Sequence, residues 1–281
     1  MSSFVSRSND LDLSNVIFTT PKLNPATKKL TAAILNGDIK KQYYIESPNL
    51  IASFGLSIYD PTNGSDPSSS VYSVPLRVDF KPDEQESETE PENTRMQRKF
   101  LAFLKGLDEK AINFGLENSQ LIFKKQYANT PANRGVVEAL YSPLVKANIG
   151  KDGTQYQDRI QLKLNANEEK TGPNSSYLFF KDTATPIAIE SWNQLGEMIP
   201  KGASVKVIIS PQIYFIPGKF GIKLKLIQMK VPNVQRIGRP IGYAFSDPPL
   251  EAAETAVVEK KSAKTETHAD DSDEEPEEID E

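Results

Sequence analysis

Apolar and polar positions alternate with a period of two along much of the second half of the chain. In 159–164 (RIQLKL) every second residue is apolar, which is typical of a strand with one buried face. The alternation is clearest in 219–231, where one set of side chains is apolar and the other contains Lys219, Lys223 and Lys225. Phe220 belongs to the apolar set, so we expect its side chain on the core side of the strand. The pattern predicts a half-buried sheet with lysines on its solvent face.

Shorter apolar runs bounded by turn residues predict further strands. Segments 50–59 and 71–80 enclose the turn-rich sequence DPTNGSDPSSS and predict a long hairpin. Pro211 is expected to interrupt a β segment, because proline cannot donate a hydrogen bond to a ladder. The predicted strands are 15–20, 50–59, 71–80, 143–149, 159–164, 177–181, 203–209, 213–216 and 219–231.

Two segments have helical rather than strand periodicity. Apolar residues after Thr94 recur at spacings of three and four, which predicts a helix capped by Thr94 and ending near Gly115. Segment 192–199 (WNQLGEMI) predicts a short helix with Ser191 as its N-cap. Segment 121–127 fits either a short helix or a strand. Together these elements predict a mainly β chain of the α+β kind.

The residue types present leave little room for catalysis. The 281-residue chain has no cysteine and one histidine, His268, which excludes disulfides, a histidine-based triad and a zinc site of clustered His or Cys. Carboxylates within the predicted strands are isolated, and 218–221 lacks the spacing of a phosphate-binding loop. We expect no enzyme, metal or cofactor. We also expect no membrane partner, because no apolar run could span a bilayer and the N-terminus lacks a signal-peptide core.

The net charge of −5 conceals two oppositely charged parts. Residues 251–281 hold thirteen carboxylates and three lysines, which predicts a disordered tail, because such a segment cannot bury enough apolar surface to offset its ordering entropy. Residues 82–94 hold six carboxylates and no base, which indicates an acidic flexible loop. The remaining chain carries thirty basic and nineteen acidic residues, a net of +11. We therefore expect a folded basic body over 1–250, followed by the tail.

The stretch 198–246 contains no acidic residue but eight basic ones, interleaved with aromatic side chains. Cations that follow phosphates and rings that stack on bases suit a single-stranded nucleic acid. For any one residue the alternative is a core aromatic ring or a lysine on a solvated face, and two adjacent strand residues cannot both stack. The expected backbone contacts are Lys206, Lys219, Lys223, Lys225, Lys230, Arg236 and Arg239. The expected stacking residues are among Tyr214, Phe215, Tyr243, Phe245 and Trp192.

The hairpin at 214–231 (YFIPGKFGIKLKLIQMKV), the helix at Trp192 and the acidic C-terminal segment resemble the single-stranded DNA-binding proteins of T-odd podophages. Their relatives in large nucleocytoplasmic DNA viruses look more similar still, with 143–231 matching best. The resemblance implies an OB-fold, a five-stranded Greek-key barrel whose groove binds single strands, here with added strands and a helix. It also implies a dimer acting in viral DNA replication, recombination and repair, soluble inside the cell, in the host cytoplasm or nucleus.

In that family the acidic tail takes the place of DNA in the basic groove. It also contacts replication proteins such as the polymerase or the helicase–primase. The residues expected to act in this way are Asp270, Asp271, Asp273, Glu274, Glu275, Glu277, Glu278, Asp280 and Glu281.

Two other functions fit parts of the pattern. A chaperone or scaffold for basic proteins would explain the acidic tail, but not an acid-free basic stretch. A single-stranded RNA binder would explain that stretch equally well, because OB-folds bind either polymer and only the family resemblance favours DNA. We expect a non-catalytic single-stranded DNA-binding protein whose tail competes with DNA for the basic groove.

Overall fold

The computed structural model describes residues 5–27, 29–62, 70–181 and 183–231. Backbone contacts divide the chain into two units, Met1–Asn233 and Val234–Glu281, and the second lies outside the described residues. Every helix and strand named from here on belongs to the first unit.

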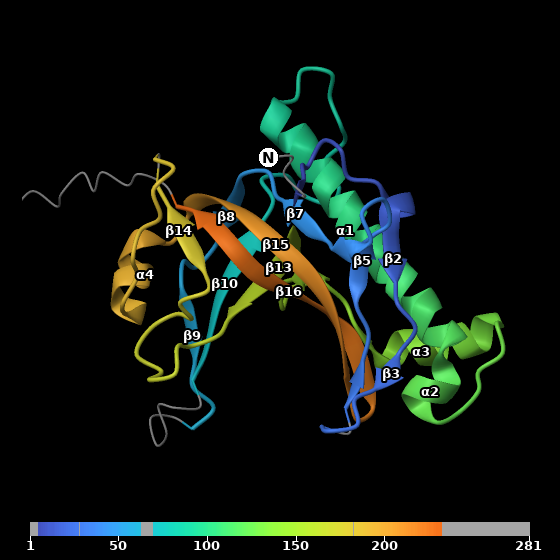
Figure 1. Cartoon of the computed structure of the whole chain (residues 1–281). Coiled ribbons are helices and arrows are strands. Elements are labelled where there is room, and N and C mark those ends of the chain that lie inside the picture. The colour runs from blue at the N-terminus through green and yellow to red at the C-terminus, as the bar shows by residue number, and fades with distance from the viewer. Residues whose placement is uncertain (1–4, 28, 63–69, 182, 232–281) are drawn as a thin grey trace, which may run out of the picture. The chain divides into compact units, whose positions relative to one another are not determined.

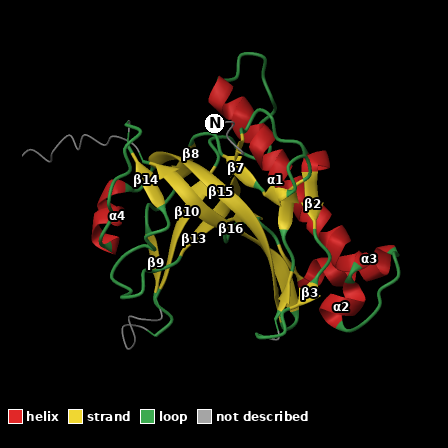
Figure 2. Ribbon diagram, viewed as in Figure 1, coloured by secondary structure: helices red, strands yellow, loops and turns green. Residues whose placement is uncertain are grey.

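A large curled mixed sheet forms the body of this unit (Figures 1 and 2). Its central path runs β1 (Val5–Ser6), β7 (Tyr44–Glu46), β15 (Ala203–Ile216), β8 (Leu50–Ala52), β10 (Val71–Arg77), β13 (Gln155–Leu164) and β12 (Val145–Ile149). The strand β16 (Lys219–Lys230) pairs with β15 and with two short strands, β11 (Tyr141–Ser142) and β14 (Leu178–Phe180), while β9 (Ser57–Tyr59) pairs with β10.

The curl nearly closes on itself. Strands β16, β15, β8, β10 and β13 follow one another by pairing, and β13 then returns to contact β16. No backbone ladder joins β13 directly to β16 within the described strands, and the short strands β11 and β14 pair with this edge of β16 instead. The mainly β, OB-like fold class predicted from the sequence is confirmed, as a partly open barrel with added strands and helices.

Four α-helices accompany the sheet within the described residues. They are α1 (Glu92–Glu117), α2 (Ser119–Phe123), α3 (Pro131–Leu140) and α4 (Trp192–Met198), with a 3-10 turn η1 (Leu13–Asn15) near the N-terminus. In Figure 1, α1, α2 and α3 group together, whereas α4 lies near β14. None of these helices is long and apolar enough to cross a membrane.

The long helix α1 confirms the helical periodicity but not its predicted start. Its apolar positions, including Phe100, Phe103 and Leu107, are buried in the core as expected. The helix begins at Glu92, because the carbonyl of Pro91 already accepts from the amides of Thr94 and Arg95. Thr94 is therefore inside the helix rather than its N-cap. For α4 the predicted cap is confirmed, since the Ser191 hydroxyl accepts from the Gln194 amide at 3.2 Å.

Long-range pairing corrects two strand predictions, and the open choice for segment 121–127 is resolved in part. Strand β15 continues through Pro211, because its pairing with β7 ends at Ile209 and the proline lies where only β16 is its partner strand. Segment 50–59 is divided between β8 and β9, which both pair with β10. Segment 121–127 begins inside the short helix α2.

Two small sheets precede the main one and were mostly missed by the sequence patterns. They are β2 (Val16–Phe18) with β5 (Ile34–Asn36) and β6 (Lys41–Gln42), and β3 (Lys22–Leu23) with β4 (Leu30–Thr31). The first packs on β15, where the Gln42 amide donates to the Ser210 hydroxyl at 2.8 Å. Strands of two or three residues are too short to show an alternation of apolar and polar positions.

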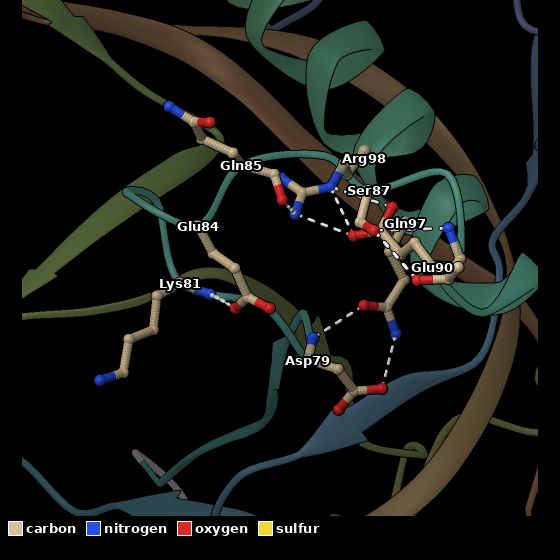
Figure 3. A network of polar contacts seen from close by, with 9 residues as sticks. Asp79, Lys81, Glu84, Gln85, Ser87, Glu90, Gln97 and Arg98 are labelled. Carbon is tan, nitrogen blue, oxygen red and sulfur yellow. Dashed lines mark hydrogen bonds and ion pairs between the residues drawn. The ribbon is translucent and has the colours of Figure 1, made fainter.

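Arg98 of α1 organises the acidic segment 82–94 (Figure 3). Its guanidinium lies 4.1 Å from the centroid of the Phe80 ring and donates to the Glu90 carboxylate at 2.9 Å and to the Gln85 carbonyl at 3.3 Å. Nearby, the Gln97 amide bridges to Asp79. These contacts anchor the segment at two points, and its flexibility between them stays a prediction.

Candidate nucleic-acid interface

The lysines of the long hairpin share one face because β16 contains a bulge. Ile208 pairs with Gln228 and Ile209 with Leu226, which leaves Ile227 as one extra residue in β16. The extra residue reverses the parity of the strand, so that Leu226 and Met229 are both fully buried. All five lysines predicted in β15 and β16 therefore lie on the face opposite the core: Lys206, Lys219, Lys223, Lys225 and Lys230.

Lys206 is already paired with a carboxylate. The Lys206 ammonium forms an ion pair with the Glu46 carboxylate of β7, which stands opposite Ile208 in the sheet. An anion binding at this position would compete with that pair. Lys206 therefore contributes less free positive charge than its place in the sequence implied.

A cleft of about 640 Å³ opens along the seam between β13 and β16. Four lysines line it, together with amide side chains and two tyrosines, and no acidic residue takes part in the lining. Within the described part of the chain these lysines form no ion pair. The charged lining consists of Lys146 from β12, Lys163 from β13, and Lys223 and Lys225 from β16.

Tyr214 is the predicted stacking residue that reaches the cleft. It stands opposite Gly221 in the β15–β16 ladder. A Cβ on Gly221 would lie 2.8 Å from both the Tyr214 hydroxyl and the Ser142 carbonyl oxygen. The space above this glycine is therefore occupied by the tyrosine and by β11. Gly221 allows the close approach that sets the tyrosine at the cleft.

Two other predicted stacking residues lie away from the cleft. Phe215 is partly buried and packs against the hydrophobic core, opposite the fully buried Phe220. Trp192 is only 6% exposed and stacks on Tyr72 with ring centroids 3.7 Å apart, while its indole N–H donates to the Lys170 carbonyl. Neither ring is among the residues that line the cleft.

A buried carboxylate supports one rim of the cleft. Asp108 of α1 accepts from the Tyr141 hydroxyl at 2.6 Å and from the amides of Leu144 and Val145 at 3.0 and 3.4 Å. Burial raises the pKa of Asp108 despite these hydrogen bonds, and burial together with the neighbouring carboxylate raises the pKa of Tyr141. The turn that it holds brings Lys146 to the cleft.

Lys146 and Lys163 are not among the contacts predicted from the sequence. Their outward parity was visible, since Lys163 alternates with Leu162 and Leu164 in the predicted strand. What the sequence does not show is the seam that brings β12 and β13 next to β16. The predicted residues Arg236, Arg239, Tyr243 and Phe245, and all nine carboxylates selected in the tail, lie outside the described residues.

Comparison with known proteins gives only distant structural likenesses. No family model and no curated protein matches the chain. The single-stranded DNA-binding protein from bacteriophage Enc34 in complex with ssDNA is 16% identical, with a TM-score of 0.37 over 79% of this chain and 98% of that chain. The same phage protein in a second structure is 13% identical, with a TM-score of 0.37 over 83% of this chain and 96% of that chain.

The single-stranded DNA-binding protein gp2.5 of bacteriophage T7 is 14% identical, with a TM-score of 0.35 over 67% of this chain and 91% of that chain. These are phage proteins, and the closer resemblance to relatives in nucleocytoplasmic viruses stays a prediction. Likeness at this level carries no functional inference, so function has to be inferred from the cleft.

Proposed function

We propose that the chain binds single-stranded nucleic acid without catalysis, in the cleft between β13 and β16. The observation that carries the proposal is the cleft's charge: four lysines without an ion pair among the described residues, and no acid in the lining. Such a site suits a polyanion whose phosphates displace counterions. The amide side chains of Gln161, Asn165 and Gln212 add donors and acceptors for base edges.

A single strand suits this cleft better than a duplex. Tyr214 stands in the lining rather than on an open surface, so it can stack only on a base that is not already paired and stacked within a helix. We take DNA rather than RNA as the partner on the resemblance of 214–231. We further propose that the protein serves viral DNA replication, recombination and repair as a dimer, with its acidic tail regulating access to the cleft.

The test is binding of fluorescent oligonucleotides across a salt series. Lys223→Gln/Lys225→Gln removes two cleft cations, and each lost phosphate contact lowers the salt slope by about 0.7. We expect a slope smaller by about 1.4 and affinity about 25-fold weaker near 0.1 M salt. The matched control, Arg95→Gln/Lys99→Gln, removes the same charge from exposed positions of α1 and should bind like wild type.

Three nucleic-acid ligands distinguish single-strand binding from duplex binding, and DNA from RNA. Single-stranded DNA should bind more tightly than the same sequence as a duplex, and single-stranded RNA reports whether sugar chemistry matters. If the cleft variant and the α1 control lose affinity equally, the cleft is not the site. If wild type binds no nucleic acid but binds a basic protein, the chaperone alternative replaces this proposal.

A further inference from the structure

Three cations stand directly opposite one another on neighbouring strands beside the cleft. Lys146 of β12 pairs with Arg159 of β13, and Arg159 pairs with Arg77 of β10. Directly paired residues in an antiparallel sheet point to the same face, so these side chains form a row across three strands. With strands about 4.8 Å apart, the row is about 10 Å long. We call these three residues the cation ladder.

The like charges of the ladder face one another across the strands. Like charges directly opposite each other destabilise a sheet, and an anion lying across them would remove that cost. The nearest acids along the chain are engaged elsewhere: Asp79 accepts from the Gln97 amide at 3.0 Å, Asp158 pairs with Lys105 at 2.7 Å, and Asp152 accepts from the Thr154 hydroxyl at 2.7 Å. Within the described residues no carboxylate forms an ion pair with the ladder.

An exposed tyrosine lies on the same face at the end of the ladder. Lys146 pairs with Arg159 but Asn148 pairs with Tyr156, so β13 accommodates one extra residue between these partners. Since Lys146 and Asn148 share a face of β12, Arg159 and Tyr156 share it too. Tyr156 is 43% exposed. Its ring lies close over the turn, where a Cβ on Gly150 would be 3.0 Å from Cε2.

We propose that a single strand leaving the cleft crosses the cation ladder, with phosphates on Arg159 and Arg77 and a base stacked on Tyr156. Continuity supports this path, because Lys146 belongs to both the cleft and the ladder. The inference rests on the proposed function of the cleft and extends it by a second subsite. Cations beside an exposed ring are the combination that binds a single strand without regard to sequence.

The first test is the dependence of affinity on oligonucleotide length. Single strands of about 4 to 16 nucleotides span the range of sites on one OB-fold. For wild type, affinity should rise once the strand is long enough to leave the cleft. Arg77→Gln/Arg159→Gln should bind the shortest strands like wild type. On long strands it should lose about 1.4 in salt slope and about 25-fold in affinity near 0.1 M salt.

Variants that keep the charge or the ring test whether a loss of affinity comes from misfolding rather than from a lost contact. Arg77→Lys/Arg159→Lys should retain the salt slope of wild type, and Arg95→Gln/Lys99→Gln on α1 is again the matched control for charge. Tyr156→Ala should weaken binding of long strands by about 5- to 150-fold, the loss of one base stack. Tyr156→Phe keeps the ring and should bind like wild type.

The outcomes separate the two proposals. If the ladder and Tyr156 variants match wild type at every length while Lys223→Gln/Lys225→Gln binds weakly, the ladder is not a subsite and the cleft still is. If the ladder variant loses affinity equally on the shortest and longest strands, the second-subsite assignment is wrong. If wild type binds no single strand, both proposals fall.

Discussion

Asp108 does not line the cleft, yet its hydrogen bonds position one rim of it. Its carboxylate has three hydrogen-bond donors aimed at it, the Tyr141 hydroxyl and two backbone amides. In Asp108→Asn the amide nitrogen would face a donor, because an asparagine side chain has a single oxygen. We expect the free energy of unfolding in urea to fall by about 1–3 kcal/mol. An unchanged unfolding midpoint would show that the carboxylate does not support the rim.

The same residue predicts a pH dependence with a definite sign. Burial raises the pKa of Asp108 above the ordinary 3.8, so the folded protein keeps this proton to a higher pH than the unfolded chain. The stability that the group contributes is fully present below that ordinary value, and falls as pH rises toward the raised pKa. The stability difference between wild type and Asp108→Asn should therefore shrink across that window, and a constant difference would contradict the assignment.

Parity predicted single residues well wherever the strand itself decided their place. Phe220 lies in the core and the hairpin lysines point outward, as the alternation indicated. Trp192 could not be placed in this way, because its stacking partner Tyr72 is remote in the sequence and no local pattern links them. Lys146 was missed for the same reason, since it lines the cleft only because β16 lies across the seam from it.

At the scale of elements, the bulge at Ile227 keeps one face of β16 basic along its whole length. Inserting an alanine after Ile227 would move Met229 to the solvent side and turn Lys230 toward the core, or else break the pairing with β14. Exposure of Met229 alone costs about 1.5–3 kcal/mol, so we expect a loss of unfolding free energy larger than this. Urea denaturation measures the loss.

Ile227→Ala is the control for that insertion. It removes side-chain volume but keeps the residue count and so the faces of the strand. Since Ile227 is only partly buried, the substitution should cost less than the insertion. Equal destabilisation of the two variants would mean that the faces of this strand do not depend on the number of residues in the bulge.

Long alternating elements were predictable from the sequence, whereas short ones were not. β13 and β16 have enough residues to show their period, and α1 has enough turns. The strands of two or three residues near the N-terminus exist only through pairing with remote partners, so propensity alone could not identify them. Pro211 misled for a related reason, since the cost of a proline depends on which neighbour strands are present.

At the scale of the whole molecule, the proposed regulation depends on the segment 251–281. The composition of this segment predicts a flexible coil, and about thirty residues of such a coil span roughly 30 Å on average. Truncation to 1–250 should tighten binding of single strands. The gain in affinity should decrease as the salt concentration rises, because salt screens the charges of the tail and of the phosphates alike.

The matched control keeps the tail and removes its charge. Replacing its nine selected carboxylates by amides should tighten binding as truncation does: Asp270, Asp271, Asp273, Glu274, Glu275, Glu277, Glu278, Asp280 and Glu281. If truncation tightens binding and the neutral tail does not, the tail acts by its bulk. If neither the truncation nor the neutral tail changes the affinity or the salt slope, the proposal that the tail competes with DNA is wrong.

The seam between β13 and β16 is joined less completely than the other junctions of the curl. No ladder pairs β13 with β16 among the described strands, where the short strands β11 and β14 pair with this edge of β16 instead. We therefore expect the two walls of the cleft to separate more easily here than strands that share a long ladder. A slot with one compliant wall would adjust to purines and pyrimidines of different width, so the proposed binding would depend little on the identity of the base.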